Sequence, residues 1–522
     1  MNRNRTVGRV AGCLVLAAVT TAFTARAQAS SCDWLTRLQL TATRIVAADV
    51  NGPGGEGGAE LAIPAPGVRY CRVQAIIEKE IGVEVWLPEP QAWNGRLLVV
   101  GVGGQAGQFN YRELARGLRR GYATASTDTG HKAGDTHWLL GDPMRAANYA
   151  YRANHLLADK LKNISKSYYK REAQHAFFIG CSGGGRQALT EVQRFPRDFD
   201  GVIAGAPGPK TPEMSARRMW EMVQHSRHAG LMSEADWHLL ADAAVKKCDA
   251  LDGVSDGVLE NPTQCRYDIA ALTCAGRKTS ECLAAEQVQF ARVIYGPLSD
   301  ENGRQIDDGL LPGVLVTAVP APEPFTPGPP YLAVALFGDG VHKDINWDPM
   351  SFRLSSDLPA IDRVMDLHAD HADLNEFKSH GGKLIIYQGW GDPLVAAQQT
   401  VAYVQAVRQA MTDARTDSFL RLFMVPGMGH CSGGNATDHF GGMGGDAPMV
   451  DPEHDLLSAL EYWTQSGHAP QQIVASKLES GRVVRTRPLC AYPAQSHYLG
   501  IGNTDDAASF KCDAPRNVLA IY

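Results

Sequence analysis

The 522-residue sequence lacks several patterns that identify other protein classes. No two cysteines have the C-x-x-C spacing, which argues against a zinc ribbon and against a redox-active dithiol. It contains no internal repeat or low-complexity tract, and no run of one charge sign suggests a nucleic-acid or membrane-surface partner. The apolar content of 44% and the charged content of 20% instead suit a globular protein. The length suffices for one large domain with an insertion, or for two to three ordinary domains.

The N-terminus has the pattern of a targeting segment. Three arginines precede an apolar, small-residue run over residues 10–23, and residues 25–27, Ala-Arg-Ala, fit an A-x-A cleavage site. The alternative is a membrane anchor, but about 14 apolar residues are too few to span a bilayer. We therefore predict a signal peptide over residues 1–27 and a secreted or periplasmic protein.

The cysteine content agrees with export. The chain has eleven cysteines, and Cys13 would leave with the signal peptide. An even number of cysteines in an exported chain predicts disulfides, here five. The ten that remain are Cys32, Cys71, Cys181, Cys248, Cys265, Cys274, Cys282, Cys431, Cys490 and Cys512.

A strand, a sharp turn and a helix are predicted in succession over residues 175–192. Residues 180–184 read G-C-S-G-G, the G-x-S-x-G pattern of a nucleophile elbow, with Ser182 at its centre. The glycines have a steric reason, because side chains two residues before and after the serine would collide. The alternative is a plain glycine-rich turn. A phosphate-binding loop is disfavoured because no G-K-[ST] follows.

Strands and helices alternate on both sides of this turn. Alternation of this kind implies a parallel sheet with right-handed crossovers, and we predict an α/β-hydrolase fold. The other strand patterns lie in residues 82–87, 96–101, 121–126, 199–207, 382–393 and 419–425.

The alternation stops over residues 208–378, which are rich in proline and glycine and carry four of the cysteines. We predict that this insertion is a lid packed over the carboxyl edge of the sheet, and that residues 28–207 and 379–522 form the catalytic domain. Helical patterns occur within the insertion at residues 211–226, 233–247 and 283–294.

Ser182, Asp392 and His430 each follow directly after a predicted strand. The carboxyl ends of parallel strands lie at one edge of a sheet, and the order Ser, Asp, His is that of the α/β-hydrolase fold. His430 would take the serine proton, and Asp392 would hold the imidazole tautomer. The alternatives are an ordinary loop histidine and an aspartate that caps a helix before Pro393.

Cys181 and Cys431 stand next to the predicted nucleophile and the predicted base. If they are bonded, their Cα atoms lie within roughly 4.4–6.8 Å, which would bring Ser182 and His430 together. Cys181 as the nucleophile is rejected, because an elbow exposes its central residue.

Backbone N–H groups near Ser182 could form an oxyanion hole. The elbow aims the N–H of Gly183 at the place where an oxyanion would form. The glycine-rich turn after the strand at 96–101 would supply a second N–H, from Gly103 or Gly104. The alternative for that turn is a tight connection with no ligand.

Three carboxylates lie within eight residues inside the insertion: Asp249, Asp252 and Asp256. They repel one another unless a cation sits between them, and oxygen ligands suit Ca²⁺ before Mg²⁺. Carbonyl groups of Val254 and Val258 could complete the shell of a structural calcium. The spacing does not match an EF-hand, and the alternative is a solvated acidic turn.

Several of these stretches together resemble the tannase and feruloyl esterase family, which also contains the mono(2-hydroxyethyl) terephthalate hydrolases. The resemblance covers nearly the whole mature chain, and the Cys-Ser…His-Cys arrangement is specific to that family. The matching stretches are residues 125–131, 180–187, 199–207, 248–258, 389–393 and 426–431.

The resemblance implies roles for individual residues of this chain. It implies the triad Ser182, Asp392 and His430, the bond Cys181–Cys431, and the calcium ligands Asp249, Asp252, Val254, Asp256 and Val258. It further implies the disulfides Cys32–Cys71, Cys248–Cys265, Cys274–Cys282 and Cys490–Cys512. Two departures are visible: Gly183 replaces a usual threonine or similar residue, and Gln388 stands where a histidine is common.

We therefore expect a secreted serine carboxylesterase that cleaves feruloyl, caffeoyl or galloyl esters derived from plant cell walls or tannins. An alternative in the same fold is hydrolysis of a terephthalate monoester, which needs a lid cation such as Arg353 for the free carboxylate. An alternative of another class is a calcium-dependent binding module with an inactive triad. No nucleic-acid partner is expected, and no membrane partner after removal of the leader.

Overall fold

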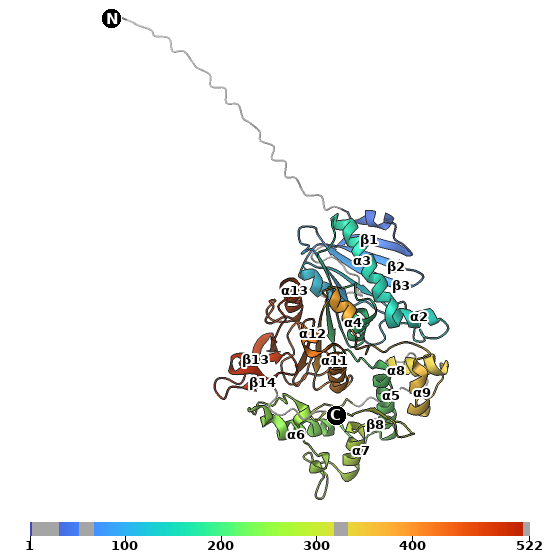
Figure 1. The fold of residues 1–522 in the computed structure, drawn as a ribbon, viewed down its shortest axis with the longest axis vertical. Helices are drawn as coiled ribbons and strands as arrows, with labels where there is room; N and C mark the ends of the chain where they lie inside the picture. Colours follow the sequence, from blue (N-terminus) through green and yellow to red (C-terminus); the bar gives the residue numbers. More distant parts are fainter. Residues whose placement is uncertain (3–30, 52–66, 318–331, 515–522) are drawn as a thin grey trace. The chain divides into compact units, whose positions relative to one another are not determined.

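The computed structural model describes residues 1–2, 31–51, 67–317 and 332–514 (Figure 1). Most of the predicted signal peptide and its cleavage site lie outside the described residues, so both stay predictions. Residues 32–522 make one compact unit, and the predicted boundaries of the lid at 208 and 378 also stay predictions. Among the described helices, none combines the length and the apolar character that crossing a bilayer requires.

A nine-stranded sheet forms the centre of this unit, in the order β1-β2-β3-β5-β4-β6-β7-β10-β11. The strands from β5 to β11 in this order pair in parallel, whereas β1, β2 and β3 add an antiparallel edge. The strands are β1(Thr43–Asn51), β2(Tyr70–Ile77), β3(Ile81–Pro88), β4(Arg96–Val100), β5(Ala123–Thr127), β6(His175–Cys181), β7(Gly201–Gly205), β10(Lys383–Gly389) and β11(Leu420–Val425).

The parallel strands are short apolar runs because helices cover both faces of the sheet. Residues of β6, β10 and β11 are almost all buried, which is typical of a strand enclosed on both sides. One apolar cluster joins one face of the sheet to α3(Ala153–Tyr169), α4(Gly183–Arg194) and α11(Ala397–Met411). A second cluster joins the other face to α1(Tyr111–Arg119) and α13(Leu456–Ser466). The predicted α/β fold is confirmed.

The insertion between β7 and β10 is largely helical. Its three longest helices fall within one or two residues of the predicted patterns. It has an apolar cluster of its own around Trp237 and Phe290, and it shares another with residues 102–150 of the sheet region. Helices α5 and α9 contact each other (Figure 1). Its main elements are α5(Thr211–Arg227), α6(Glu234–Cys248), α7(Ala285–Tyr295), β8(Leu298–Ser299), β9(Gln305–Asp307), α8(Leu332–Val334), η6(Ala335–His342), α9(Leu354–Ile361) and α10(Asn375–Ser379).

The remaining elements are peripheral to the sheet. Two antiparallel hairpins lie near the C-terminus, β12 with β13 and β14 with β15. These elements are α2(Pro143–Ala147), η2(Asn148–Arg152), α12(Asp413–Asp417), β12(Gln472–Glu479), β13(Arg482–Cys490), β14(Gln495–Tyr498) and β15(Phe510–Asp513), with the short 3-10 helices η1(Asp33–Arg37), η3(Asp249–Asp252), η4(Pro262–Gln264), η5(Ile269–Leu272), η7(Pro349–Ser351) and η8(Ala507–Ser509).

The ten cysteines from Cys32 onward are all paired. The five bonds are Cys32–Cys71, Cys181–Cys431, Cys248–Cys265, Cys274–Cys282 and Cys490–Cys512. This is the pairing that the resemblance implied.

Candidate active site

Ser182 lies between β6 and α4 in a backbone conformation that side chains rarely adopt, with φ 61° and ψ −126°. The chain can turn this sharply because glycines flank the serine. A Cβ on Gly180 would lie 2.2 Å from the carbonyl oxygen of Gly184, and one on Gly184 would lie 3.1 Å from the carbonyl carbon of Gly101. Position 180 has no room for a side chain and position 184 is tight, so the turn has the geometry of a nucleophile elbow.

Asp392 follows β10 and is fully buried, and its two oxygens have different partners. Oδ2 pairs with Nδ1 of His430 over 2.8 Å. Oδ1 accepts hydrogen bonds from the backbone N–H groups of Leu394 and Val395, over 2.8 and 3.0 Å. The aspartate therefore contacts the histidine and also accepts hydrogen bonds from the turn after Pro393. It is not the cap of a helix, because α11 begins only at Ala397 and its N-cap residue is Ala396.

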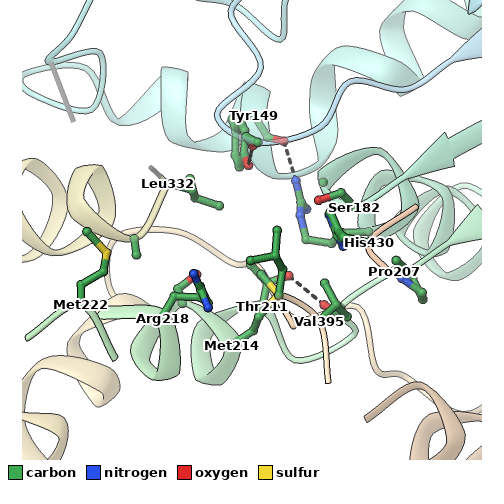
Figure 2. Close-up of a pocket in the computed structure, with 18 residues that line it drawn as sticks. Tyr149, Ser182, Pro207, Thr211, Met214, Arg218, Met222, Leu332, Val395 and His430 are labelled. Atoms are coloured by element: carbon green, nitrogen blue, oxygen red, sulfur yellow. Dashed lines mark hydrogen bonds between the residues drawn. The ribbon is translucent and has the colours of Figure 1, made fainter. Parts of the chain in front are cut away.

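The disulfide between Cys181 and Cys431 has a Cα–Cα distance of 6.0 Å. It joins the chain directly before Ser182 to the chain directly after His430. These two residues line one cavity (Figure 2). No hydrogen bond joins the Ser182 hydroxyl to His430 among the described residues.

The turn after β4 approaches the elbow at Gly183. A Cβ on Gly183 would lie 3.2 Å from the backbone nitrogen of Gly104. Gly104 and Gly183 both line the cavity that contains Ser182, whereas Gly103 does not. A Cβ on Gly103 would instead face the backbone oxygen of Cys181, at 3.6 Å. Of the two glycines left open by the sequence, only Gly104 lines this cavity together with Gly183.

The cavity has a volume of about 160 Å³ and mostly apolar walls. A cavity of roughly 150 Å³ can hold one benzene ring, so this space matches a single aromatic group. Helix α5 supplies one wall, and in Figure 2 its Met214 and Arg218 lie across from Ser182 and His430. The apolar lining includes Ala206, Pro207, Met214, Met222, Leu332, Ala333, Leu394 and Val395.

Two arginines also line this cavity, and only one of them has an acidic partner. Arg218 donates from Nη1 to Oε2 of Glu221 over 2.5 Å and to the carbonyl of Pro393 over 3.4 Å. Its Nε and Nη2 make no hydrogen bond with the described residues. Arg186 is fully buried and donates to the backbone carbonyls of Ala150 and Tyr149, and burial lowers its pKa from the ordinary value.

Arg353, the lid cation considered from the sequence, does not line this cavity. Its side chain is exposed, and it borders a separate pocket with Trp220 and Phe352. The sequence could not distinguish it from Arg218, because both lie in predicted lid segments and orientation depends on how the helices pack.

A second cavity, of about 450 Å³, lies on another side of His430. Trp390 and Pro393 from the loop that holds Asp392 form part of its wall, and His238 and Asp242 of α6 form another part. His430, the candidate catalytic base, therefore lines both cavities, which differ in volume and in lining residues.

The predicted calcium segment, residues 248–258, forms a compact turn in which the negative charges of the carboxylates are only partly balanced. Asp249 Oδ1 accepts from the backbone N–H groups of Asp256 and Gly257, both over 3.1 Å. Arg487 forms an ion pair with Asp256. Burial, followed by the negative charges of Asp256 and Asp249, raises the pKa of Asp252 to about 6.

The donor groups of the segment determine whether it suits a cation. Among the described residues, no group of three His, Cys, Asp or Glu side chains converges as a metal site. A cation here would therefore need backbone carbonyls, such as those of Val254 and Val258, besides the carboxylates. The oxygen-only donor set and the raised pKa of Asp252 fit a hard cation, and calcium stays a prediction.

Sequence reasoning missed two residues of the site and left a third without a role. Tyr149 and Arg218 line the cavity but belong to helical patterns that carry no sign of a site. For Gln388 the sequence shows only a departure from the family pattern. In the structure its amide donates to Oδ2 of Asp392 over 3.1 Å.

This chain is similar to known proteins over most of its length. The model of the family described as "Tannase and feruloyl esterase" matches residues 67–322 and 332–513. An uncharacterized esterase of Xanthomonas campestris pv. campestris is 36% identical, over 96% of this chain and 94% of that protein. A mono(2-hydroxyethyl) terephthalate hydrolase of Piscinibacter sakaiensis is 31% identical, over 85% of each chain.

Solved structures agree with the sequence comparisons. The crystal structure of feruloyl esterase B from Aspergillus oryzae superposes with a TM-score of 0.84 and 26% identity, covering 92% of this chain and 99% of that one. The similarity extends over the sheet and the insertion together, because almost the whole of both chains is matched.

Proposed function

The chain belongs to the tannase and feruloyl esterase family, a family of carboxylic ester hydrolases, and on this premise we propose that it is a serine esterase acting on esters of aromatic acids. The observation that carries the proposal is the arrangement around one cavity. Ser182 and His430 line it, and Asp392 holds the histidine through a 2.8 Å contact. We infer from this arrangement that Ser182, His430 and Asp392 are the nucleophile, the base and the orienting acid.

The first half of the proposed reaction forms an acyl-enzyme. The oxygen of Ser182 attacks the ester carbonyl carbon while its proton passes to Nε2 of His430. The carbonyl π electrons become an oxyanion, which accepts hydrogen bonds from the N–H groups of Gly183 and Gly104. The oxyanion then collapses, the bond to the alcohol oxygen breaks, and His430 returns the proton to the leaving alcohol.

The second half repeats these steps with water. His430 takes a proton from the water as its oxygen attacks the acyl carbon, and Ser182 leaves with that proton. Each oxyanion donor contributes about 10²- to 10³-fold to the rate in comparable enzymes, so the placement of both glycines matters. Asp392 contributes by keeping the imidazole in the tautomer whose Nε2 is free to accept a proton.

We infer the substrate class from the two cavities. The smaller, mostly apolar one has the volume of one aromatic ring and would take the acid half, in the manner of feruloyl, caffeoyl or galloyl esters. The larger one borders His430, which must reach the leaving oxygen, so it offers room for the alcohol half. Plant cell-wall or tannin-derived esters have this composition.

A second candidate substrate is a terephthalate monoester. One relative, from Piscinibacter sakaiensis, is by name a mono(2-hydroxyethyl) terephthalate hydrolase. Arg218 is the specific observation that favours this candidate here, because two of its nitrogens are unpaired among the described residues and it lines the cavity opposite Ser182 (Figure 2). A guanidinium in that place could bind the distal carboxylate of a terephthalate ring.

Two further features belong to the proposal. A structural calcium would be held by Asp249, Asp252 and Asp256 with the carbonyls of Val254 and Val258, and would offset the burial and the neighbouring negative charges that raise the pKa of Asp252. Secretion or periplasmic export through the signal peptide at residues 1–27 is supported by the five disulfides.

One experiment tests the proposal and its rival of another class, a calcium-dependent binding module with an inactive triad. A p-nitrophenyl ester of an aromatic acid should give a burst of p-nitrophenol equal to the enzyme concentration, and Ser182→Ala should abolish it. Absence of a burst and of turnover in the wild type would leave only the binding module. Rates on methyl ferulate, methyl gallate and a terephthalate monoester, measured side by side, would then rank the acids.

A further inference from the structure

The loop after β4 must hold one N–H in place for the proposed oxyanion hole, although its sequence, G-V-G-G at residues 101–104, is the least constrained backbone available. Gly104 has φ +59°, and no atom lies within 4 Å of where its Cβ would be. The Cβ side of Gly104 is therefore open, and no packing on that side fixes its conformation. The N–H direction must be held through the peptide groups on either side.

Both neighbouring peptide groups are tied by hydrogen bonds. The N–H of Ala106 donates to the carbonyl of Gly103 over 3.1 Å. In a planar trans peptide the carbonyl of Gly103 and the N–H of Gly104 point in opposite directions, so the bond to this carbonyl also sets the direction of the N–H. The hydroxyl of Tyr149 donates to the carbonyl of Gly104 over 2.7 Å and fixes the following peptide. With both planes held, the two soft dihedrals of Gly104 are held as well.

Tyr149 is itself held by the helix that follows the nucleophile. Arg186, four residues after Ser182, donates to the carbonyls of Ala150 over 2.7 Å and Tyr149 over 3.1 Å, and its guanidinium lies 5.1 Å from the tyrosine ring centre. These carbonyls belong to η2(Asn148–Arg152), a π-helical turn of a kind that is frequent at functional sites.

Two more aromatic rings pack beside the Tyr149 side chain. Trp138 lies 5.1 Å from the Tyr149 ring and donates from its indole nitrogen to the side-chain oxygen of Gln105, next to Gly104. His131 stacks on Trp138 at 4.0 Å. The stretch 125–131, one of those that resemble the family, thereby ends at His131, which stacks on Trp138.

We propose that Tyr149 is a positioning residue that couples the nucleophile's helix to the oxyanion loop, through Arg186 on one side and the carbonyl of Gly104 on the other. The proposal rests on the proposed esterase function and deepens it. Tyr149 does not take the role of a base: burial raises its pKa, so its hydroxyl keeps the proton it donates.

The test is Tyr149→Phe, which keeps the ring and removes only the hydroxyl. Aligned oxyanion donors act on the transition state alone, so kcat per titrated active site should fall about tenfold or more while KM changes by less than about twofold. The inhibition constant of phenylboronic acid, whose tetrahedral adduct places an oxygen in the oxyanion hole, should rise by the same factor. The affinity for the free aromatic acid product should not change.

Tyr151→Phe is the matched control, because Tyr151 lies on the same π-helical turn but outside the cavity and should give wild-type constants. An unchanged kcat in Tyr149→Phe would overturn the proposal. So would a raised KM with kcat intact, which would make the hydroxyl a substrate contact. A drop in melting temperature and burst amplitude with a normal rate per site would make it a structural residue. Failure of the esterase function itself is seen separately, as no burst in the wild type.

Discussion

Gln388 donates a hydrogen bond from its side-chain amide to Oδ2 of Asp392, over 3.1 Å. That oxygen is also the one paired with the ring of His430. The amide cannot rotate freely, because Thr400 donates to its oxygen over 2.9 Å. Gln388 therefore fixes the carboxylate from the side opposite the two backbone amides, and the departure from the family's usual histidine preserves a donor at this position.

Removing that donor should slow turnover. We expect Gln388→Leu to lower kcat by about three- to tenfold, because a buried carboxylate oxygen loses one of its two partners and Asp392 gains freedom to turn. Gln388→His should retain most of the activity, since an imidazole N–H can donate to the same oxygen. Steady-state kinetics of both variants on one aromatic ester checks this, and equal activity in Gln388→Leu and the wild type would contradict it.

The disulfide between Cys181 and Cys431 should matter for turnover as well as for stability. Its loop spans 250 residues, for which the chain-entropy model gives on the order of 5 kcal/mol. We expect replacement of both cysteines by alanine to lower kcat about tenfold or more, because a small displacement of Ser182 from His430 is costly.

The bond between Cys274 and Cys282 is the control for this measurement. It closes a loop of only 8 residues within the insertion, and its removal should lower the melting temperature slightly and leave kcat unaltered. Kinetics per burst-titrated site, with thermal unfolding of each variant, separates the two effects. A wild-type rate in the Cys181/Cys431 variant would show that the bond only stabilises the fold.

Arg218 should determine how well the enzyme accepts a negatively charged ring. In Arg218→Met, kcat/KM for a terephthalate monoester should fall at least about tenfold, the loss expected for a charge-assisted hydrogen bond, while methyl ferulate should be affected much less. Arg353→Met, which removes an exposed arginine outside the cavity, should alter neither substrate. A parallel loss for both esters in Arg218→Met would mean that the arginine supports the fold of α5 instead.

Calcium removal should destabilise the insertion. A ligand that binds only the folded state raises its stability, so excess chelator should lower the melting temperature by a few degrees, and added Ca²⁺ should restore it. Asp252→Asn should abolish this response while leaving the folded protein intact. Differential scanning calorimetry with and without chelator decides the matter, and an identical curve in both would remove calcium from the proposal.

His131 should make stability depend on pH. Burial lowers its pKa to about 4, against an ordinary value of 6.5. In the unfolded chain the histidine is protonated below about pH 6.5, whereas in the folded protein it stays neutral down to about pH 4. The free energy of unfolding is therefore highest above pH 6.5 and decreases as the pH falls from 6.5 toward 4.

The matching variant is His131→Phe, which keeps an aromatic ring against Trp138. Between pH 7 and pH 5 the wild type should lose on the order of 2 kcal/mol more unfolding free energy than the variant. All other titratable groups are shared, so the difference isolates this histidine. Urea unfolding at the two pH values measures it, and parallel losses in both proteins would refute the assignment.

The sequence by itself determined the fold class and the candidate triad. Buried parallel strands are short apolar runs, and their carboxyl ends must meet at one edge, so residues that follow them are neighbours whatever the rest of the chain does. Gly180 could be explained from sequence for a similar reason, since the collision with Gly184 that it avoids is local, whereas the neighbour that Gly184 meets, Gly101, comes from the end of another strand. The disulfide pairing came from the resemblance, because spacing alone leaves many connectivities open.

The tertiary structure decided what depends on the packing of distant elements. It placed Gly104 and Arg218, and neither Gly103 nor Arg353, at the cavity, and gave Gln388 and Tyr149 their partners. Helical periodicity predicts which face of a helix is buried, but the neighbour that this face meets is set by how α5, η2 and α4 pack across hundreds of residues. A hydrogen bond depends on tenths of an ångström and on orientation, and these are fixed only when the whole core is assembled.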